Sequence, residues 1–190
     1  MTRAVGLATI CVLIILMLSS FRLWPEPDPP LPPPVHETTR PTVHPYKLPE
    51  KYREWVIRYC NETATPVWLA CRMFGQESVG DPMAEDWEPD AVSWAGAMGL
   101  AQLMPQNLLP FAVRYNDGNA IDPFDPETAI RVGIRYLADL HALTGSWRTA
   151  VMVYNGGLSH FINPKKYGDW KEETINYVTA IMGEEKNEKK

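Results

Sequence analysis

Apolar residues recur at steps of three and four along residues 50–183, which is the spacing of one face of an α-helix. The stretch 125–145 shows this pattern together with end signals: Asp125 is placed to cap a helix, Pro126 to begin it and Gly145 to end it. No run alternates apolar and polar residues for long enough to require a β-sheet. The sequence therefore predicts an all-α domain over residues 50–183, with five or six helices.

The other expected helices follow from their own periodicity or end signals. They cover residues 50–60, 66–77, 105–115, 146–157 and 171–182. Thr65 is placed to cap the second of these and Ser146 the fourth, and Pro110 is placed to interrupt or kink the third. Asp169 and Glu172 have the spacing of a capping box ahead of the last. Residues 79–99, which are rich in Gly, Pro and Asp, predict a loop.

The N-terminal quarter has a different composition. Arg3 and Arg22 bracket 18 uncharged residues, the lower limit for a membrane-spanning helix. Residues 1–22 are expected to be an uncleaved signal anchor, with a cleaved signal peptide as the alternative. Residues 23–49 hold ten of the 18 prolines and predict an extended linker, or else a docking site for a proline-binding partner. Residues 184–190 predict a charged, flexible tail.

The charge balance excludes some partners. The chain has a net charge of −5, and from residue 50 onward it carries 14 Lys and Arg against 20 Asp and Glu. Proteins that bind phosphate backbones carry clustered basic residues, so we expect no nucleic acid and no attraction to anionic lipid through charge. Neutral or mixed polymers such as glycans remain candidates.

The histidines and cysteines do not suggest a metal centre. The four histidines show no metal-ligand spacing, and His36 and His44 lie in the proline-rich tract. No metal and no cofactor are therefore expected. Cys60 and Cys71 both fall on inward helix faces, where a disulfide and a buried pair of free thiols are both plausible.

Glu77 lies at an unusual position for an acidic residue. The apolar stripe of the helix over residues 66–77 consists of Val67, Ala70, Cys71 and Phe74. Glu77 comes three residues later, so the same periodicity turns it toward the core. An apolar environment raises the pKa of a carboxyl group, which suits a general acid that cleaves a glycosidic bond. The alternative is a structural glutamate satisfied by hydrogen bonds.

A conventional glycosidase pairs its acid with a second carboxylate. Glu173 is one candidate because it shares a helix face with Tyr177, although a first-turn acid is also favoured by the helix dipole. Ser78 lies in "GQESVG", which departs from the spacing of a serine-hydrolase elbow and follows no strand. We expect Ser78 to form a hydrogen bond at the helix end and not to act as a nucleophile.

Four short motifs together resemble a known family. They are "ES" at 77–78, "AVSWAGAMGLAQLMP" at 91–105, "VYNGG" at 153–157 and "ETINYV" at 173–178. In this order they resemble the lytic transglycosylases related to the soluble bacterial enzyme, which share the goose-lysozyme-like fold. The resemblance covers nearly all of residues 50–183.

The resemblance implies a lysozyme-like helical lobe with a glycan groove and a single catalytic glutamate, Glu77. Acting as an acid, Glu77 would protonate the β-1,4 oxygen between N-acetylmuramic acid (MurNAc) and N-acetylglucosamine (GlcNAc). Acting then as a base, it would take the proton of the muramyl C6 hydroxyl, which attacks the anomeric carbon. The product is a 1,6-anhydro sugar, and no second carboxylate is needed because the substrate supplies the nucleophile.

The resemblance also implies which residues bind the substrate. These are Ser78, Ser93, Met98, Gln102, Tyr154, Asn155, Glu173 and Tyr177. The alternatives are that Met98 and Tyr154 are core residues and that Asn155 is a turn residue before Gly156.

The chain departs from the family pattern in the loop after Glu77. Ala101 stands where methionine is usual, and Trp94 where proline is common. The segment between Glu77 and Ser93 is also longer than is typical and contains Trp87. Trp87 can stack on a sugar ring or plug the core, and the sequence does not decide between these roles.

The expected function is therefore that of a peptidoglycan lytic transglycosylase whose partners are glycan strands. It would be anchored in a membrane by residues 1–22, with the catalytic domain on the periplasmic or cell-wall side. A muramidase on the same fold and a non-catalytic glycan-binding module are the alternatives. Endo or exo action, the need for peptide-bearing glycan, the oligomeric state and an envelope-spanning machine as a partner are left open.

Overall fold

Residues 44–184 are described by the structure, a computed structural model. The expected anchor over residues 1–22, most of the linker and the tail beyond residue 184 lie outside the described residues. Within residues 44–184, no helix is both long enough and apolar enough to cross a membrane.

The described residues form an all-helical domain, as the sequence predicts. The elements in chain order are 3₁₀-helix η2 (Glu50–Tyr52), α2 (Arg53–Thr63), α3 (Val67–Val79), 3₁₀-helix η3 (Pro105–Asn107), α4 (Leu108–Tyr115), α5 (Pro126–Thr144), α6 (Trp147–Gly156), α7 (Leu158–Ile162), α8 (Pro164–Tyr167) and α9 (Glu172–Met182). Six of the eight α-helices in this part of the chain have eight residues or more. No strand occurs between residues 44 and 184, where β-pairing is limited to two isolated bridges.

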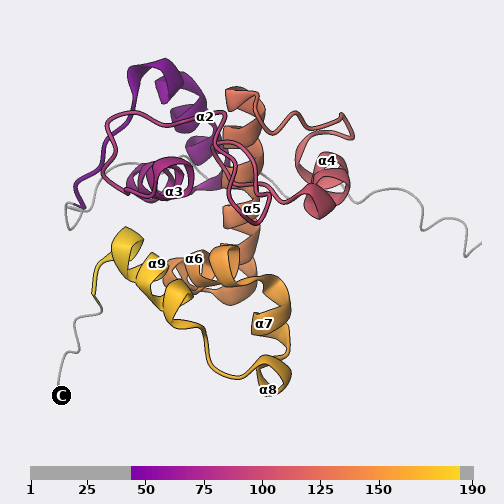
Figure 1. The fold of residues 1–190 in the computed structure, drawn as a ribbon. Coiled ribbons are helices and arrows are strands. Elements are labelled where there is room, and N and C mark those ends of the chain that lie inside the picture. The colour runs from indigo at the N-terminus through magenta and orange to yellow at the C-terminus, as the bar shows by residue number, and fades with distance from the viewer. Residues whose placement is uncertain (1–43, 185–190) are drawn as a thin grey trace, which may run out of the picture. The chain divides into compact units, whose positions relative to one another are not determined.

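Helix α5 runs through the middle of the domain, and α2, α4 and α6 pack against it (Figure 1). Helix α2 reaches the N-terminal part of α5, where Tyr59 contacts Glu127, whereas α4 packs against α5 farther along, at Tyr136 and Asp139. Helix α6 follows α5 after a short turn and packs back against it. Helix α9 packs against both α6 and α3. The ends of α3 and α6 are therefore brought together by a helix that comes last in the chain.

Apolar burial holds α5 in this central place. Its residues Ile130, Ile134 and Leu137 are fully buried, as is Val56 of α2. Burying a side chain of this size contributes roughly 1.5–3 kcal/mol relative to leaving it in water. The three- and four-residue spacing of the buried α5 positions is the spacing seen in the sequence.

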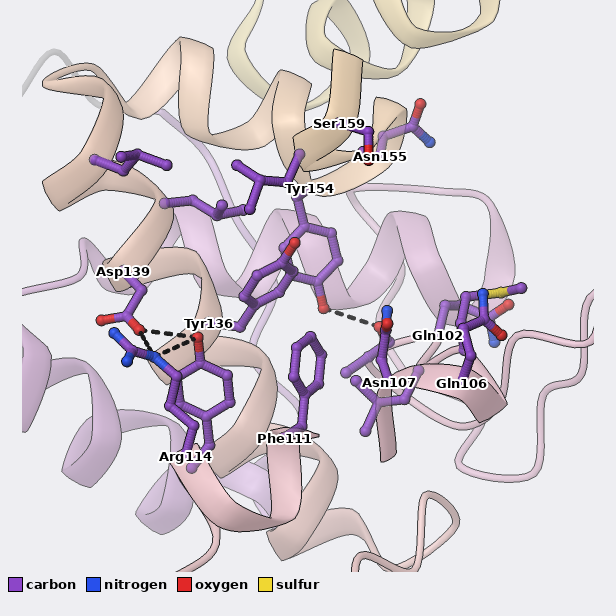
Figure 2. A pocket seen from close by; sticks show the side chains of 18 residues that line it. Gln102, Gln106, Asn107, Phe111, Arg114, Tyr136, Asp139, Tyr154, Asn155 and Ser159 are labelled. Carbon is purple, nitrogen blue, oxygen red and sulfur yellow. Dashed lines mark hydrogen bonds and ion pairs between the residues drawn. The ribbon is translucent and has the colours of Figure 1, made fainter. Parts of the chain in front are cut away.

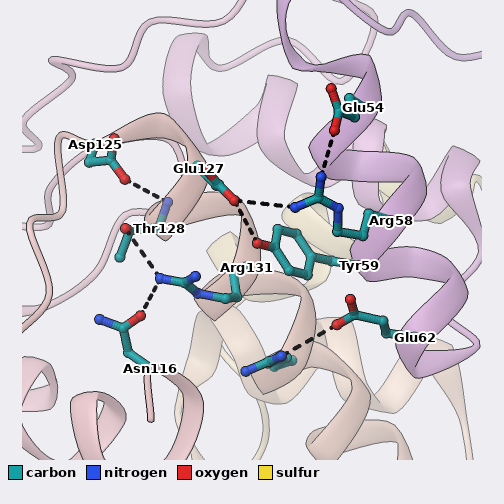
Figure 3. A network of polar contacts seen from close by, with 10 residues as sticks. Glu54, Arg58, Tyr59, Glu62, Asn116, Asp125, Glu127, Thr128 and Arg131 are labelled. Carbon is teal, nitrogen blue, oxygen red and sulfur yellow. Dashed lines mark hydrogen bonds and ion pairs between the residues drawn. The ribbon is translucent and has the colours of Figure 1, made fainter. Parts of the chain in front are cut away.

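Polar contacts complete the packing of α2 against α5 (Figure 3). The Tyr59 hydroxyl donates a hydrogen bond to Glu127 Oε1 at 2.9 Å, and Arg58 forms an ion pair with the same carboxylate at 3.6 Å. Arg131 donates to the side chain of Asn116, which ties the segment after α4 to α5. Exposed ion pairs contribute little stability, so we regard this network mainly as a means of fixing the register of the two helices.

The predicted ends of α5 and α6 are confirmed. The Asp125 carboxylate accepts a hydrogen bond from the Thr128 backbone N–H, and α5 ends at Gly145, whose φ is 70°. The Ser146 hydroxyl accepts from the Thr149 backbone N–H and caps α6. Local hydrogen bonding decides these ends, which explains why the sequence predicts them.

Two other predicted helix caps and one predicted helix interruption are wrong. Pro66 takes the N-cap position of α3 in place of Thr65, whose hydroxyl bonds to the Thr63 hydroxyl at 2.8 Å. Pro110 lies in the first turn of α4 and does not interrupt it, because the backbone N–H groups of a first turn have no intrahelical partner. Lys171 is the N-cap of α9, so Asp169 and Glu172 do not form a capping box.

Trp170 explains where α9 begins. A Cβ atom added at Gly156 would lie 2.5 Å from the Trp170 ring, so the indole packs closely against the end of α6. This contact fixes the chain just before α9 and overrides the local capping signal. Tertiary packing, which a local pattern does not contain, sets this helix end.

The loop between α3 and η3 has a buried anchor. Trp87 is only 2% exposed and stacks on Tyr52, with ring centroids 5.4 Å apart and an interplanar angle of 13°. Its indole also lies 5.4 Å from the Phe74 ring of α3. Trp87 is therefore a hydrophobic plug, and this settles the alternative that the sequence left open.

We predict that Trp87→Ala lowers the free energy of unfolding by about 3–5 kcal/mol, because it leaves a large cavity beside α3. Trp94 in the same loop is 97% exposed and provides the matched control. Trp94→Ala should change the unfolding free energy by no more than about 0.5 kcal/mol. Urea unfolding of both variants measures the difference, and similar losses in the two would contradict the assignment of Trp87 as the plug.

Candidate functional site

Glu77 lies in the last turn of α3, one turn after the fully buried Phe74. Its side chain is half-buried. Glu77 Oε1 accepts a hydrogen bond of 2.5 Å from the hydroxyl of Tyr177 on α9. The inward direction predicted from the periodicity of the helix is therefore the one the structure has.

Burial raises the pKa of the Glu77 carboxyl from its ordinary value of 4.5 to about 7. The Tyr177 hydrogen bond acts in the opposite direction, because it stabilises the carboxylate. Desolvation is the larger effect, so a substantial fraction of Glu77 is protonated at neutral pH. Such a group can donate a proton and accept one again under the same conditions.

A pocket of about 770 Å³ opens beside Glu77, and we call it the acid pocket. Its walls include Gln76, Glu77, Asn155, Glu173, Asn176 and Tyr177. Helix α3 contributes the acid, α6 ends at the pocket, and α9 forms the opposite wall. Glu172 and Glu173 are exposed residues of the first turn of α9, so the pocket holds two carboxylates besides Glu77.

A second pocket of about 720 Å³ is also lined by Asn155, and we call it the aromatic pocket (Figure 2). Its walls include Gln102, Phe111, Tyr136, Asp139, Tyr154 and Asn155. The rings of Tyr136 and Phe111 lie 4.7 Å apart, and those of Tyr136 and Tyr154 lie 5.3 Å apart. Because Asn155 lines both pockets, the two are neighbouring sections of one surface.

An ion pair closes the far wall of the aromatic pocket. Arg114 Nε donates to Asp139 Oδ2 at 2.5 Å, and the Tyr115 hydroxyl donates to the same oxygen at 2.9 Å (Figure 2). The pocket thus offers aromatic faces beside charged and amide groups. Sugars present both apolar faces and hydroxyl groups, so this mixed lining suits them.

Tyr154 connects the aromatic pocket to the loop that follows α3. Its hydroxyl donates a hydrogen bond to the Ala101 carbonyl at 2.9 Å. Burial raises the pKa of the Tyr154 phenol well above its ordinary value, and the nearby Glu77 charge raises it further. Tyr154 is therefore a neutral hydrogen-bonding residue of the pocket wall.

The structure brings five of the predicted substrate-binding residues to the two pockets. Glu173 and Tyr177 line the acid pocket, Gln102 and Tyr154 line the aromatic pocket, and Asn155 lines both. The Gln102 amide donates to the carbonyls of residues 99 and 91, and its backbone has a φ of 46°. Its side chain therefore also holds the loop in place.

Ser78, Ser93 and Met98 are absent from the walls of these two pockets. The Ser78 hydroxyl donates to the carbonyl of residue 74 one turn earlier, at 2.7 Å, which is the helix-end role expected from the sequence. The Ser93 hydroxyl accepts from the Ala97 backbone N–H at 3.0 Å. Met98 forms both isolated β-bridges of the loop, one with Val92 and one with residue 103.

The sequence did not single out several residues of the site. Phe111, Tyr136 and Asp139 line the aromatic pocket, but in the sequence they read as ordinary positions of helices. Thr174 is 4% exposed and donates a hydrogen bond from its hydroxyl to Asn155 Oδ1 at 2.9 Å. Thr174 lies inside the motif "ETINYV", and this was the one feature of the sequence that pointed to it. The periodicity of a helix does not predict that a polar residue is buried.

The two cysteines of this part of the chain are free thiols. Cys60 and Cys71 are both buried and unpaired. Burial raises the pKa of the Cys60 thiol to about 12, and that of Cys71 rises for the same reason. Neither forms a reactive thiolate near neutral pH. Among residues 44–184, no cluster of three or more His, Cys, Asp or Glu side chains is arranged to hold a metal ion.

We predict that Glu77→Gln stabilises the protein more at pH 8 than at pH 4. Between pH 4.5 and about 7, the unfolded chain ionises Glu77 while the folded chain keeps it protonated. The stability of the wild type therefore falls as pH rises through this window, whereas the glutamine variant lacks the effect. The difference in ΔΔG between the two pH values should be on the order of 2–3 kcal/mol.

Urea unfolding at both pH values measures this difference, and parallel pH profiles for the two proteins would contradict a raised pKa.

Tyr177→Phe tests the opposing contribution of the hydrogen bond. Because it removes a donor to the carboxylate, it should raise the pKa of Glu77 further, as read from the ¹³C resonance of the Glu77 carboxyl.

Comparison with known proteins identifies the family and the fold of the domain. The family model described as "Transglycosylase SLT domain" matches residues 73–177, more than half of the chain. The chain is similar to an inactive mutant of the lytic transglycosylase Slt from Pseudomonas aeruginosa, with a TM-score of 0.57 and 23% identity. That match covers 70% of this chain and 23% of the other.

Two further solved structures give the same result. The 70-kDa soluble lytic transglycosylase SLT70 from Escherichia coli matches with a TM-score of 0.57 and 24% identity, over 70% of this chain and 23% of that one. A complex of the 70-kDa soluble lytic transglycosylase with bulgecin A matches with a TM-score of 0.57 and 25% identity, over 68% of this chain and 22% of that one. The chain spans less than a quarter of the length of these proteins.

These likenesses confirm the lysozyme-like helical fold of the lytic transglycosylases for the described domain. The family match begins four residues before Glu77 and ends at Tyr177, so it contains both partners of the hydrogen bond at the centre of the site. The resemblance seen in the sequence is confirmed, and the chain belongs to the transglycosylase SLT domain family.

Proposed function

We propose that the protein is a lytic transglycosylase that cleaves peptidoglycan between MurNAc and GlcNAc without consuming water. The observation that carries the proposal is Glu77, a half-buried carboxyl group with a pKa of about 7 at the edge of a pocket. A binding module has no need of such a group, because burying an ionisable residue lowers stability. A reaction that moves a proton twice near neutral pH does need it.

The proposed reaction uses Glu77 first as an acid. Its carboxyl proton moves to the oxygen that links MurNAc C1 to GlcNAc, the bond between C1 and that oxygen breaks, and GlcNAc leaves with a free hydroxyl. The Glu77 carboxylate then accepts the proton of the C6 hydroxyl on the same MurNAc, while the C6 oxygen bonds to C1. The 1,6-anhydro ring closes, and Glu77 is protonated again.

Tyr177 has a clear part in this scheme. Its hydroxyl donates to Glu77 Oε1 in the resting state, which holds the carboxyl group in one orientation. When Glu77 has lost its proton, the same hydrogen bond stabilises the carboxylate. The pKa of the Tyr177 phenol is raised well above its ordinary value by burial, so Tyr177 remains a donor throughout.

The shape of the site supports a polymeric substrate. The acid pocket and the aromatic pocket share Asn155, and their volumes are about 770 and 720 Å³. A glycan strand that occupies both would pass Asn155 and place one linkage beside Glu77. The rings of Phe111, Tyr136 and Tyr154 would then face sugars away from the cleavage point.

A hydrolytic muramidase is the second candidate, and Glu173 is the observation that favours it. This carboxylate lines the same pocket as Glu77, as a general base for water would. Glu173 is exposed, however, whereas the proton-transferring acid of the site is half-buried. We therefore prefer a reaction in which Glu77 alone moves the proton.

The cellular setting is also part of the proposal. A peptidoglycan-cleaving domain acts outside the cytoplasm, so we propose that residues 1–22 anchor the chain in a membrane and that the proline-rich linker extends the domain toward the wall. An extended linker of this kind spans roughly 3 Å per residue.

We predict that the full chain releases 1,6-anhydro-muropeptides from purified peptidoglycan. Mass spectrometry of the soluble products gives the answer, because these products are lighter by one water than hydrolytic ones. Products with reducing ends would make the protein a muramidase. Binding to the wall without any product would make it a glycan-binding module.

We also predict that Glu77→Gln lowers the rate of cleavage by at least about 10³-fold and leaves sedimentation with peptidoglycan unchanged, since the amide cannot donate or accept the transferred proton. Glu88→Gln, at an exposed carboxylate of the loop, is the matched control and should keep full activity.

Glu173→Gln distinguishes transglycosylation from hydrolysis. Loss of all activity in this variant, together with reducing-end products in the wild type, would favour hydrolysis.

A further inference from the structure

We propose that Thr174 is a positioning residue that fixes the amide of Asn155, so that Asn155 presents its N–H₂ group as a donor to the glycan. The inference rests on the proposed function and deepens it, because it assigns a hydrogen-bond donor to the point where the two pockets meet. The substrate group that it would take is an acceptor oxygen of an N-acetylated sugar.

The contact itself is direct. Thr174 Oγ1 lies 2.9 Å from Asn155 Oδ1, and it connects the first turn of α9 to the last turn of α6. Thr174 is 4% exposed, whereas Asn155 is exposed. A buried residue thus holds the side chain of an exposed one, which would otherwise sample several rotamers.

The number of partners available to the Thr174 hydroxyl decides which group donates this hydrogen bond. Within the described residues, Asn155 is the one hydrogen-bond partner of the Thr174 hydroxyl. A buried hydroxyl whose proton has no acceptor is unfavourable, so the hydroxyl donates and Asn155 Oδ1 accepts. The amide orientation is thereby fixed, and both N–H bonds of Nδ2 remain available for a ligand.

The place of Asn155 explains why its orientation matters. It is common to the walls of the acid pocket and the aromatic pocket, so a strand that occupies both must pass it. If the amide were turned over, a carbonyl oxygen would face the strand and would repel acceptor oxygens. Thr174 removes this alternative before the substrate arrives.

Packing explains why the hydroxyl is so well placed. A Cβ atom added at Gly156 would lie 3.2 Å from Thr174 Cγ2, so the methyl group of Thr174 rests against the end of α6. The methyl and hydroxyl groups together determine the χ1 rotamer of a β-branched residue. With the methyl against Gly156, the hydroxyl lies toward Asn155, and the hydrogen bond itself would hold a serine hydroxyl in the same direction.

The first test is structural and does not depend on activity. The side-chain ¹⁵N–¹H₂ resonances of Asn155 are recorded in the wild type, in Thr174→Val and in Thr174→Ser. Thr174→Val keeps the shape of threonine without the hydroxyl, so we expect the Asn155 resonances to shift and to show greater mobility. Thr174→Ser should leave them close to the wild-type positions. Unchanged resonances in Thr174→Val would overturn the inference.

The second test is a double-mutant cycle on kcat/KM with soluble, uncrosslinked peptidoglycan strands. We expect Thr174→Val to lower kcat/KM by about tenfold, which corresponds to one neutral hydrogen bond, and Thr174→Ser to stay within about twofold of the wild type. In an Asn155→Ala background, Thr174→Val should cause no further loss. An equal loss in both backgrounds, or failure of serine to replace threonine, would overturn the positioning role.

The two proposals fail in different ways. If the wild type releases no product from peptidoglycan, the proposed function fails, while the Asn155 resonances still decide whether Thr174 fixes the amide. If the wild type cleaves and the cycle is additive, the function stands and the role of Thr174 is refuted. Thr174→Ser, which keeps the hydroxyl, serves both tests even if Thr174→Val does not fold.

Discussion

The hydrogen bond from Tyr177 to Glu77 joins residues that are 100 positions apart in the chain and holds the end of α3 against α9. It forms because α9 packs on α3, and α9 also packs on α6, which in turn packs on the central helix α5. The bond also leaves the acid at the edge of a pocket and not inside the core. The chemistry we propose therefore depends on how three helices from distant parts of the chain meet.

A raised carboxyl pKa has a cost for the fold. Because Glu77 is half-buried and its pKa is about 7, the folded state becomes less favourable as pH rises toward neutrality. The core offsets this cost through large, fully buried side chains next to the site, among them Phe74 one turn before Glu77 and Leu69 on the same helix. Trp87 seals the same region from the loop side. The site thus keeps an unfavourable group in place because its surroundings are tightly packed.

The sequence predicts what is local and misses what is tertiary. The helical class, the caps at Asp125 and Ser146 and the inward direction of Glu77 all follow from spacing and end signals within one segment, and the structure agrees with them. The start of α9 is different, because the packing of Trp170 on Gly156 overrides a good capping pattern. The aromatic pocket was also beyond the sequence, since its rings come from three separate helices.

The spacing within α9 brings these observations together. Thr174 and Tyr177 are three residues apart, so they lie on the same helix face, and both are buried. One donates to Asn155 at the end of α6, and the other donates to Glu77 at the end of α3. A rotation or shift of α9 by a single residue would break both hydrogen bonds at once. The acid and the amide are therefore not set independently, and the orientation of one helix fixes the donor to the glycan together with the group that cleaves it.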